Sequence, residues 1–183
     1  GTDPYDLARS ARLAEIGAEL AGLTDRAGPG IDRVDRGPLG IRTPQVHADA
    51  AIFDDAGRLL LTRRADSGHW CMPGGAADVG ESPSEAAVRE AYEETGLRVR
   101  AEALIGVYDN RRLPGDGAVQ GHGYHLNFAC RVVGGALDVS HETTGFAWCT
   151  EPESAVRRLF RGHVLKVPAA YAWHRERAAP TFD

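Results

Sequence analysis

The stretch from Gly75 to Leu97 (GAADVGESPSEAAVREAYEETGL) constrains the fold more than any other part of the chain. Ser82 is a favourable N-cap, Pro83 suits the first helical position, and Glu85 completes a capping box. Gly96 can adopt the left-handed backbone conformation that commonly ends a helix. These signals predict a helix that begins at the proline and ends just before the closing glycine.

Three glutamates of this helix, Glu90, Glu93 and Glu94, follow the i, i+3, i+4 spacing and therefore share one face. Like charges on one face repel, so such a face is either solvated or holds a cation. Gly74 and Gly75 just upstream let the backbone approach a ligand closely. Because Mg²⁺ prefers oxygen ligands and often shares its sites with substrate phosphates, the pattern favours a metal site against a phosphate group.

The spacing of the fixed positions in this stretch matches the complete Nudix box. Those positions are Gly75, Glu81, Arg89, Glu90, Glu93, Glu94 and Gly96. The chain therefore resembles the Nudix hydrolases, which cleave nucleoside diphosphates linked to another moiety. The run from Trp70 to Pro83 and the N-terminal part also resemble a narrower subfamily that has a short helical N-terminal domain. The subfamily resemblance points to ADP-ribose or CDP-choline-like substrates.

Glu90 and Glu94, one turn apart on the same face, are the preferred metal ligands, with Glu93 next. The resemblance implies that the backbone carbonyl of Gly74 is a further ligand. It also implies Mg²⁺ as the cofactor, with Mn²⁺ as an alternative. Metal ions neutralise charge on the bridging phosphates and can activate water for attack.

Arg89 is adjacent to this metal face in sequence but is expected to point elsewhere on the helix. We expect it to form a bidentate ion pair with Glu81 and so to orient a glutamate of the site. The two residues are therefore assigned to a structural brace rather than to the metal itself.

The identity of the general base is left open by the sequence. In Nudix enzymes it lies either within the box, where Glu93 is available, or on a loop toward the C-terminus. Glu142 stands on such a loop and is a candidate for a base or an extra metal ligand. His141 beside it is an alternative, because neutral imidazole is a competent base near pH 7. The alternative is that Glu142 is a solvated loop residue without a catalytic role.

The candidate substrate contacts lie outside the box. Four arginines that lie near the box or on a polar loop could bind a phosphate, and one tyrosine could stack on a base. They are Arg63, Arg64, Arg111, Arg112 and Tyr124. The alternative for each arginine is an exposed surface position. Trp70 is assigned to the core, and Cys71 lacks the paired base that a nucleophile needs.

Alternating and apolar segments predict a strand-rich region on both sides of the box helix. We expect strands at 46–53, 58–63, 69–72, 97–108, 124–133 and 146–149, and helices at 83–95, 154–160 and 163–177. A turn at 54–57 should make the first two strands hairpin partners. The pattern fits an α+β fold, and the resemblance implies a Nudix-type α/β/α sandwich with a mixed sheet and a small N-terminal helical segment.

We divide the chain into an N-terminal helical segment with a linker, residues 1–43, and a Nudix domain, residues 44–183. The amphipathic helix expected at 6–23 either packs on its own domain or forms a small module that dimerises the chain or covers the site. A homodimer contact would use its apolar face.

The net charge of −5 gives no indication of a nucleic-acid surface. No signal peptide or transmembrane run is present, and the three cysteines lack metal-ligand spacing. We therefore expect no membrane partner and a reducing cytoplasm as the location.

The favoured function is a metal-dependent pyrophosphohydrolase whose substrate is derived from a nucleotide. Its products would be a nucleoside monophosphate and a phosphorylated remainder. One alternative is a nucleoside triphosphate pyrophosphatase of the clean-up type, which the box alone does not exclude. Another is a nucleotide-binding sensor without catalysis, which the intact box disfavours.

Overall fold

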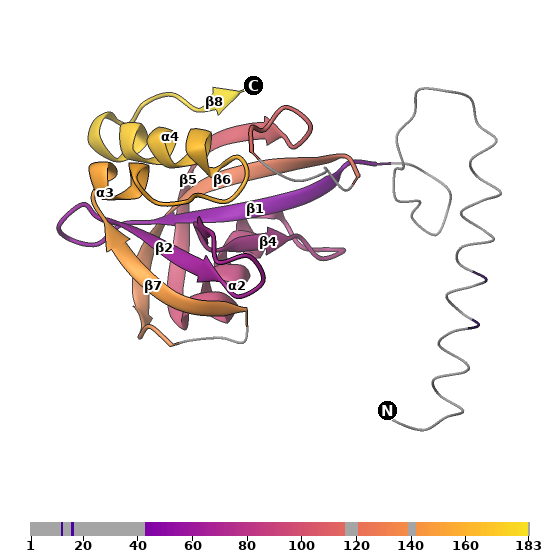
Figure 1. Cartoon of the computed structure of the whole chain (residues 1–183), viewed down its shortest axis with the longest axis horizontal. Coiled ribbons are helices and arrows are strands. Elements are labelled where there is room, and N and C mark those ends of the chain that lie inside the picture. Colours follow the sequence, from indigo (N-terminus) through magenta and orange to yellow (C-terminus); the bar gives the residue numbers. More distant parts are fainter. Residues whose placement is uncertain (1–11, 13–15, 17–42, 116–120, 139–141, 183) are drawn as a thin grey trace. The chain divides into compact units, whose positions relative to one another are not determined.

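The computed structural model describes residues 12, 16, 43–115, 121–138 and 142–182 (Figure 1). The chain divides into two compact units, Gly1–Val34 and Asp35–Asp183. In the first unit only residues 12 and 16 are described, and both are exposed and helical. The rest of the predicted N-terminal helix lies outside the described residues, and the boundary at residue 43 stays a prediction.

The larger of two sheets in the second unit is five-stranded and mixed, in the order β4-β1-β6-β5-β8. Strand β1 (Gln45–Ile52) runs parallel to β6 (Gly123–Gly135) and antiparallel to β4 (Gly74–Ala76). Strand β5 (Leu97–Asp109) pairs antiparallel with β6 and parallel with β8 (Thr181–Phe182). Two short strands, β4 and β8, were not predicted from the sequence.

The second sheet has three antiparallel strands in the order β3-β2-β7. They are β3 (Trp70–Cys71), β2 (Leu59–Arg64) and β7 (Thr143–Cys149). The predicted hairpin pairing of the first two strands is therefore wrong, because only one bridge, Phe53 to Leu59, joins β2 to the end of β1. Both edges of β1 are already occupied by β4 and β6, so the chain leaves the turn and enters the other sheet.

Helix α2 (Pro83–Thr95) has the predicted bounds and both predicted caps. The hydroxyl of Ser82 accepts a hydrogen bond from the Glu85 amide, and the Glu85 carboxylate accepts one from the Ser82 amide. Gly96 ends the helix in the left-handed conformation, with φ 73°. The helix packs closely on the sheet because its buried face is made of small residues. These residues are Ala86, Ala87 and Ala91.

Two more helices follow β7 in the chain. Helix α4 (His163–Glu176) agrees with its prediction, but α3 (Glu151–Ala155) lies earlier than the predicted 154–160. The reason is a second capping box, in which the Thr150 amide donates to the carboxylate of Glu153 and starts the helix there.

The core has two parts, one on each face of the larger sheet. Alternate residues of β1 join the cluster under α2, whereas Ala51 of β1 and Ala129 of β6 join the cluster under α4. Figure 1 shows α2 and α4 on opposite sides of the sheet. The predicted α+β class and sandwich architecture are therefore confirmed. Within the described ranges, no helix is long and apolar enough to cross a membrane.

Candidate active site

Gly74 and Gly75 form the part of β4 that lies between β1 and helix α2. A Cβ atom on Gly74 would come 2.8 Å from the Cα of Asp49, and one on Gly75 would come 2.5 Å from the Cδ of Glu90. Neither position can hold a side chain without moving its neighbour. The pair of glycines is thus required for close contact with both the sheet and the acidic helix.

Arg89 makes five hydrogen bonds that tie the acidic stretch to β4. Its Nε and Nη2 donate to the two carboxylate oxygens of Glu81, each at 3.0 Å, and Nη2 also donates to the carbonyl of Ala76 at 2.9 Å. The remaining nitrogen, Nη1, donates to Glu90 at 2.8 Å and to Glu93 at 3.0 Å. The expectation that Arg89 points away from the metal face is therefore wrong, because its Nη1 contacts Glu90 and Glu93 on that face. The bidentate pair with Glu81 is present.

Glu94 differs from the other glutamates of α2 because it is buried, and it accepts no hydrogen bond from Arg89. It is 8% exposed, and its Oε2 has no hydrogen-bond partner. Burial, together with the nearby carboxylates of Glu90 and Glu142, raises its pKa to about 8, although a backbone hydrogen bond from Gly74 opposes the rise. Burial also raises the pKa of Glu90, although Arg89 partly offsets it. The unpaired Oε2 of Glu94 can therefore bind a cation or a proton.

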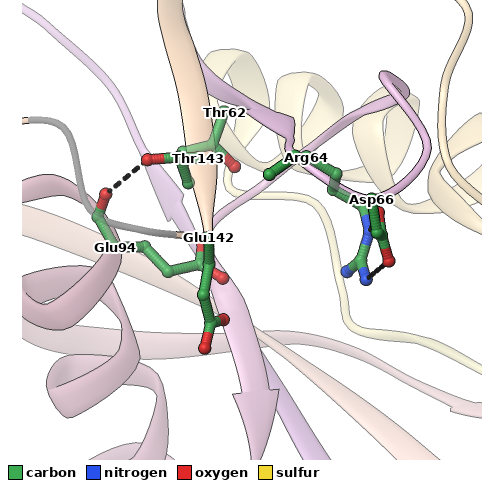
Figure 2. A pocket seen from close by; sticks show the side chains of 7 residues that line it. Thr62, Arg64, Asp66, Glu94, Glu142 and Thr143 are labelled. Carbon is green, nitrogen blue, oxygen red and sulfur yellow. Dashed lines mark hydrogen bonds and ion pairs between the residues drawn. The ribbon is translucent and has the colours of Figure 1, made fainter.

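A pocket of about 260 Å³ opens beside Glu94. Its walls come from β2 with the following turn, from the end of α2 and from the start of β7 (Figure 2). The lining residues are Thr62, Arg64, Ala65, Asp66, Glu94, Glu142 and Thr143. The hydroxyl of Thr143 donates to the backbone carbonyl of Glu94 at 3.3 Å, which ties β7 to the helix. Glu142, just before β7, is thereby placed in the same pocket as Glu94.

Comparison with known proteins agrees with this geometry. Residues 43–166 match the family model described as the NUDIX domain. The chain belongs to the Nudix hydrolase family. A MutT-like protein of Streptomyces ambofaciens is 37% identical to it over 133 residues, which cover 71% of this chain and 80% of that protein.

Two further proteins that are similar to this Nudix enzyme are both named ADP-ribose pyrophosphatase. An ADP-ribose pyrophosphatase of Methanocaldococcus jannaschii is 38% identical over 96 residues, which cover 51% of this chain and 54% of that protein. The crystal structure of an ADP-ribose pyrophosphatase from Streptococcus suis is similar with a TM-score of 0.66 and 26% identity, covering 77% of this chain and 100% of that chain. The predicted family and enzyme class are confirmed.

The donor set of this Nudix site fits a hard divalent cation. Glu90 and Glu94 offer carboxylate oxygens, one of them without a partner. In the part of the chain that the structure describes, no group of three or more His, Cys, Asp or Glu side chains is arranged to hold a metal ion by itself. Mg²⁺ is usually bound through one or two carboxylates together with substrate phosphates and water.

Arg64 is the predicted substrate residue that the fold brings into the pocket. Its guanidinium donates to the Asp66 carboxylate through Nε at 3.0 Å and Nη2 at 2.5 Å, and lies 4.4 Å from the centre of the Phe160 ring. The hydrogen bond with Arg64 lowers the pKa of Asp66 to about 2. Asp66 and Phe160 were not predicted. Asp66 could have been found as an acid two residues after an arginine in a turn, whereas Phe160 carries no signal in the sequence.

The other predicted substrate residues lie outside the lining of this pocket. Arg63 and Arg112 are exposed. Arg111 forms an ion pair with Asp109 at the end of β5, and Tyr124, which is 37% exposed, lies opposite Asp109 on β6. These residues could contact only a part of the substrate that extends beyond the pocket.

The remaining predictions concern residues near the pocket. Cys71 is buried, and burial raises the pKa of its thiol to about 12, so it is not a nucleophile at neutral pH. Trp70 is half-buried, and the guanidinium of Arg157 lies 4.2 Å from the centre of its ring, which agrees with its assignment to the core. His141 lies outside the described residues.

Proposed function

We propose that this Nudix hydrolase is a Mg²⁺-dependent pyrophosphohydrolase that cleaves the diphosphate of a nucleoside diphosphate derivative, with ADP-ribose as the lead substrate. The observation that carries the proposal is the state of Glu94. A buried carboxylate with a raised pKa and an oxygen without a partner is costly for the fold. Such a cost is characteristic of a functional site, where a ligand offsets it.

The acidic residues divide into those that hold the cation and those that hold the helix. Glu90, Glu94 and the carbonyl of Gly74 would bind the metal, while Arg89 and Glu81 form the brace that keeps α2 against β4. When bound, the cation would neutralise charge on the diphosphate and make water a stronger nucleophile. The ligands for this role lie on a helix and a strand, which position them more rigidly than a loop would.

Glu142 is the better candidate for the general base. It lies in the pocket with Glu94, whereas Glu93 is 56% exposed at its side chain and forms an ion pair with Arg89. The Glu93 carboxylate already accepts a hydrogen bond from Arg89 at 3.0 Å. Glu142 would take the proton of the attacking water, and Glu93 would support Arg89.

Arg64 would bind a phosphate oxygen of the substrate. Its planar guanidinium suits a phosphate, and Asp66 and Phe160 hold it in place across the pocket from Glu94 (Figure 2). The pocket, at about 260 Å³, is smaller than the roughly 300–1,000 Å³ of a typical small-molecule site. It therefore suits the diphosphate, and the rest of the substrate would lie outside it.

Two of the similar proteins are named as ADP-ribose pyrophosphatases, which supports ADP-ribose as the lead substrate. A specific observation also supports a second candidate, a nucleoside triphosphate pyrophosphatase. The relative that covers 71% of the chain is called MutT-like, and the same pocket could bind a triphosphate.

A substrate panel separates these candidates. ADP-ribose, CDP-choline, ATP and dGTP would be incubated with Mg²⁺ or Mn²⁺, and monophosphate, phosphate and pyrophosphate would be measured. The proposal expects AMP and ribose phosphate from ADP-ribose as the fastest reaction, and expects Glu94→Gln to abolish it. Faster pyrophosphate release from a triphosphate would favour the second candidate. Nucleotide binding without any product would contradict both.

A further inference from the structure

Lys166 is the chain's only lysine, and among the residues that the structure describes it is the largest fully buried side chain. Its Nζ donates to the Oδ2 of Asp49 at 2.7 Å, and the lysine side chain is 0% exposed. Burial raises the pKa of Asp49, but the Lys166 ammonium and the neighbouring histidine side chains together outweigh burial and hold this pKa well below its usual range. The ammonium and the carboxylate thus form a charged pair inside the protein.

Two histidines complete the surroundings of this pair. The Nε2 of His163 lies 3.7 Å from Asp49, and the Nδ1 of His125 lies 3.8 Å from it. Burial and, to a lesser degree, the Lys166 ammonium lower the pKa of His163 to about 3, so this imidazole is neutral at physiological pH. Lys166 donates a hydrogen bond to Asp49 at 2.7 Å, so it is the nearest basic partner of this carboxylate.

Asp49 lies directly opposite Gly74 in the pairing of β1 with β4. The contact is close, because a Cβ on Gly74 would come 3.0 Å from the Oδ1 of Asp49. The next residue of β1, Ala50, donates its amide to the carbonyl of Pro73 at 2.8 Å. Gly74 in turn gives the backbone hydrogen bond that Glu94 receives. A chain of contacts therefore runs from α4 through the sheet to α2.

We propose that the Lys166–Asp49 pair is a positioning device for the metal site, which fixes Gly74 and through it Glu94 from the far side of the sheet. This inference rests on the proposed function, because it assigns a role toward the cation. Stability alone does not account for the pair, since two well-packed apolar residues are often as stable as a buried ion pair, or more stable. Outer contacts that orient metal ligands are instead worth about 10–100-fold in metal affinity.

The first test measures Mn²⁺ affinity directly, by electron paramagnetic resonance of the free ion, and does not use turnover. We expect Lys166→Met and Asp49→Asn each to raise the dissociation constant by about 10-fold or more. The double variant, which leaves no unpaired charge, should regain part of the thermal stability but not the affinity. Tyr171→Phe is the matched control, because it removes the hydrogen bond from α4 to the carbonyl of Cys149 without touching β4. It should lower stability and leave Mn²⁺ affinity unchanged.

The second test uses the wild-type protein, so it does not depend on the folding of any variant. The only lysine is buried, so an amine-reactive reagent labels Lys166 only when the structure around it opens. Labelling of the α-amino group serves as the internal reference. Because coupling between two sites is reciprocal, Mn²⁺ should slow labelling of Lys166 in the wild-type protein but not in Glu94→Gln.

The outcomes distinguish this inference from the proposed function. Wild-type protein that binds no Mn²⁺ would overturn the metal site and the inference with it. Wild-type binding together with unchanged affinity in Lys166→Met and Asp49→Asn would overturn the inference alone. So would a rate of Lys166 labelling that Mn²⁺ does not change.

Discussion

Replacing Glu94 by glutamine should stabilise the metal-free protein and abolish turnover. The carboxylate of Glu94 is buried, has an oxygen without a partner, and faces Glu90 and Glu142. Glutamine has nearly the same shape and keeps an oxygen that can accept the hydrogen bond from Gly74. It cannot carry the charge, so the substitution removes the cost of burial together with the metal ligand.

The expected gain follows from the pKa of Glu94. A rise from the ordinary value of 4.5 to about 8 corresponds to roughly 5 kcal/mol, at about 1.4 kcal/mol for each tenfold change in proton affinity. Between these two pH values the folded state holds a proton that the unfolded state has lost. The stability of the wild-type protein therefore falls as pH rises through this window, and the loss is complete above pH 8. The Glu94→Gln variant shows no such loss. Its free energy of unfolding should therefore exceed that of the wild-type protein by under ~1 kcal/mol at pH 5 and by about 3 kcal/mol at pH 7.

The assay is thermal unfolding in EDTA at pH 5, 7 and 8.5, with and without Mg²⁺. At about 2–4 °C for each kcal/mol, Glu94→Gln should unfold roughly 10–20 °C above the wild-type protein at pH 8.5. The control is Glu93→Gln on the same helix. Its side chain is 56% exposed, so it should shift the melting temperature much less. Turnover of ADP-ribose by Glu94→Gln should fall by at least ~100-fold, since several kcal/mol of charge stabilisation are lost.

The reasoning is refuted if metal-free Glu94→Gln is no more stable than the wild-type protein at pH 8.5. It is also refuted if the difference between the two does not widen between pH 5 and pH 8.5. Near-wild-type turnover in the presence of Mg²⁺ would contradict the ligand assignment while leaving the burial argument intact.

Three further substitutions test other parts of the site. Gly75→Ala places a methyl group against Glu90 and should lower both stability, by about 1–3 kcal/mol, and turnover, as measured by urea unfolding and steady-state kinetics. Arg89→Lys keeps the charge but not the bidentate pair with Glu81, so turnover should fall by about 10–100-fold and raising Mg²⁺ should restore part of it. Arg64→Ala should raise KM for ADP-ribose by about tenfold with a smaller change in kcat, whereas the exposed Arg112→Ala should leave KM unchanged.

The parts of the fold that could be predicted from sequence are those set by local chemistry. Helix α2 was predicted to the residue because its start depends on Ser82 and Glu85 and its end on Gly96, all within or beside the helix. The bidentate pair of Arg89 with Glu81 was also predictable, since the box places both within one loop and one helix.

The errors concern contacts that depend on the whole sheet. The pairing of β2 with β7 rather than with β1 follows from the occupied edges of β1, and no local pattern reports them. Strand β4 was missed because two adjacent glycines indicate a loop, although here they are small enough to fit against Asp49 and Glu90. The pair of Lys166 with Asp49 joins residues 117 apart in sequence, so only the fold reveals it.

The glutamates of the box fall into two kinds, those that Arg89 contacts and Glu94, which it does not contact. Arg89 neutralises Glu81 and Glu93 and partly offsets the charge of Glu90, but it makes no bond to Glu94. A cation that binds only the folded state adds about 2.7 kcal/mol at a hundred times its dissociation constant. That is close to the roughly 3 kcal/mol that the raised pKa of Glu94 costs at pH 7. Wild-type protein saturated with Mg²⁺ to this degree should thus be about as stable as metal-free Glu94→Gln. The free energy that the buried Glu94 costs the metal-free fold would then be about equal to the free energy that bound Mg²⁺ contributes.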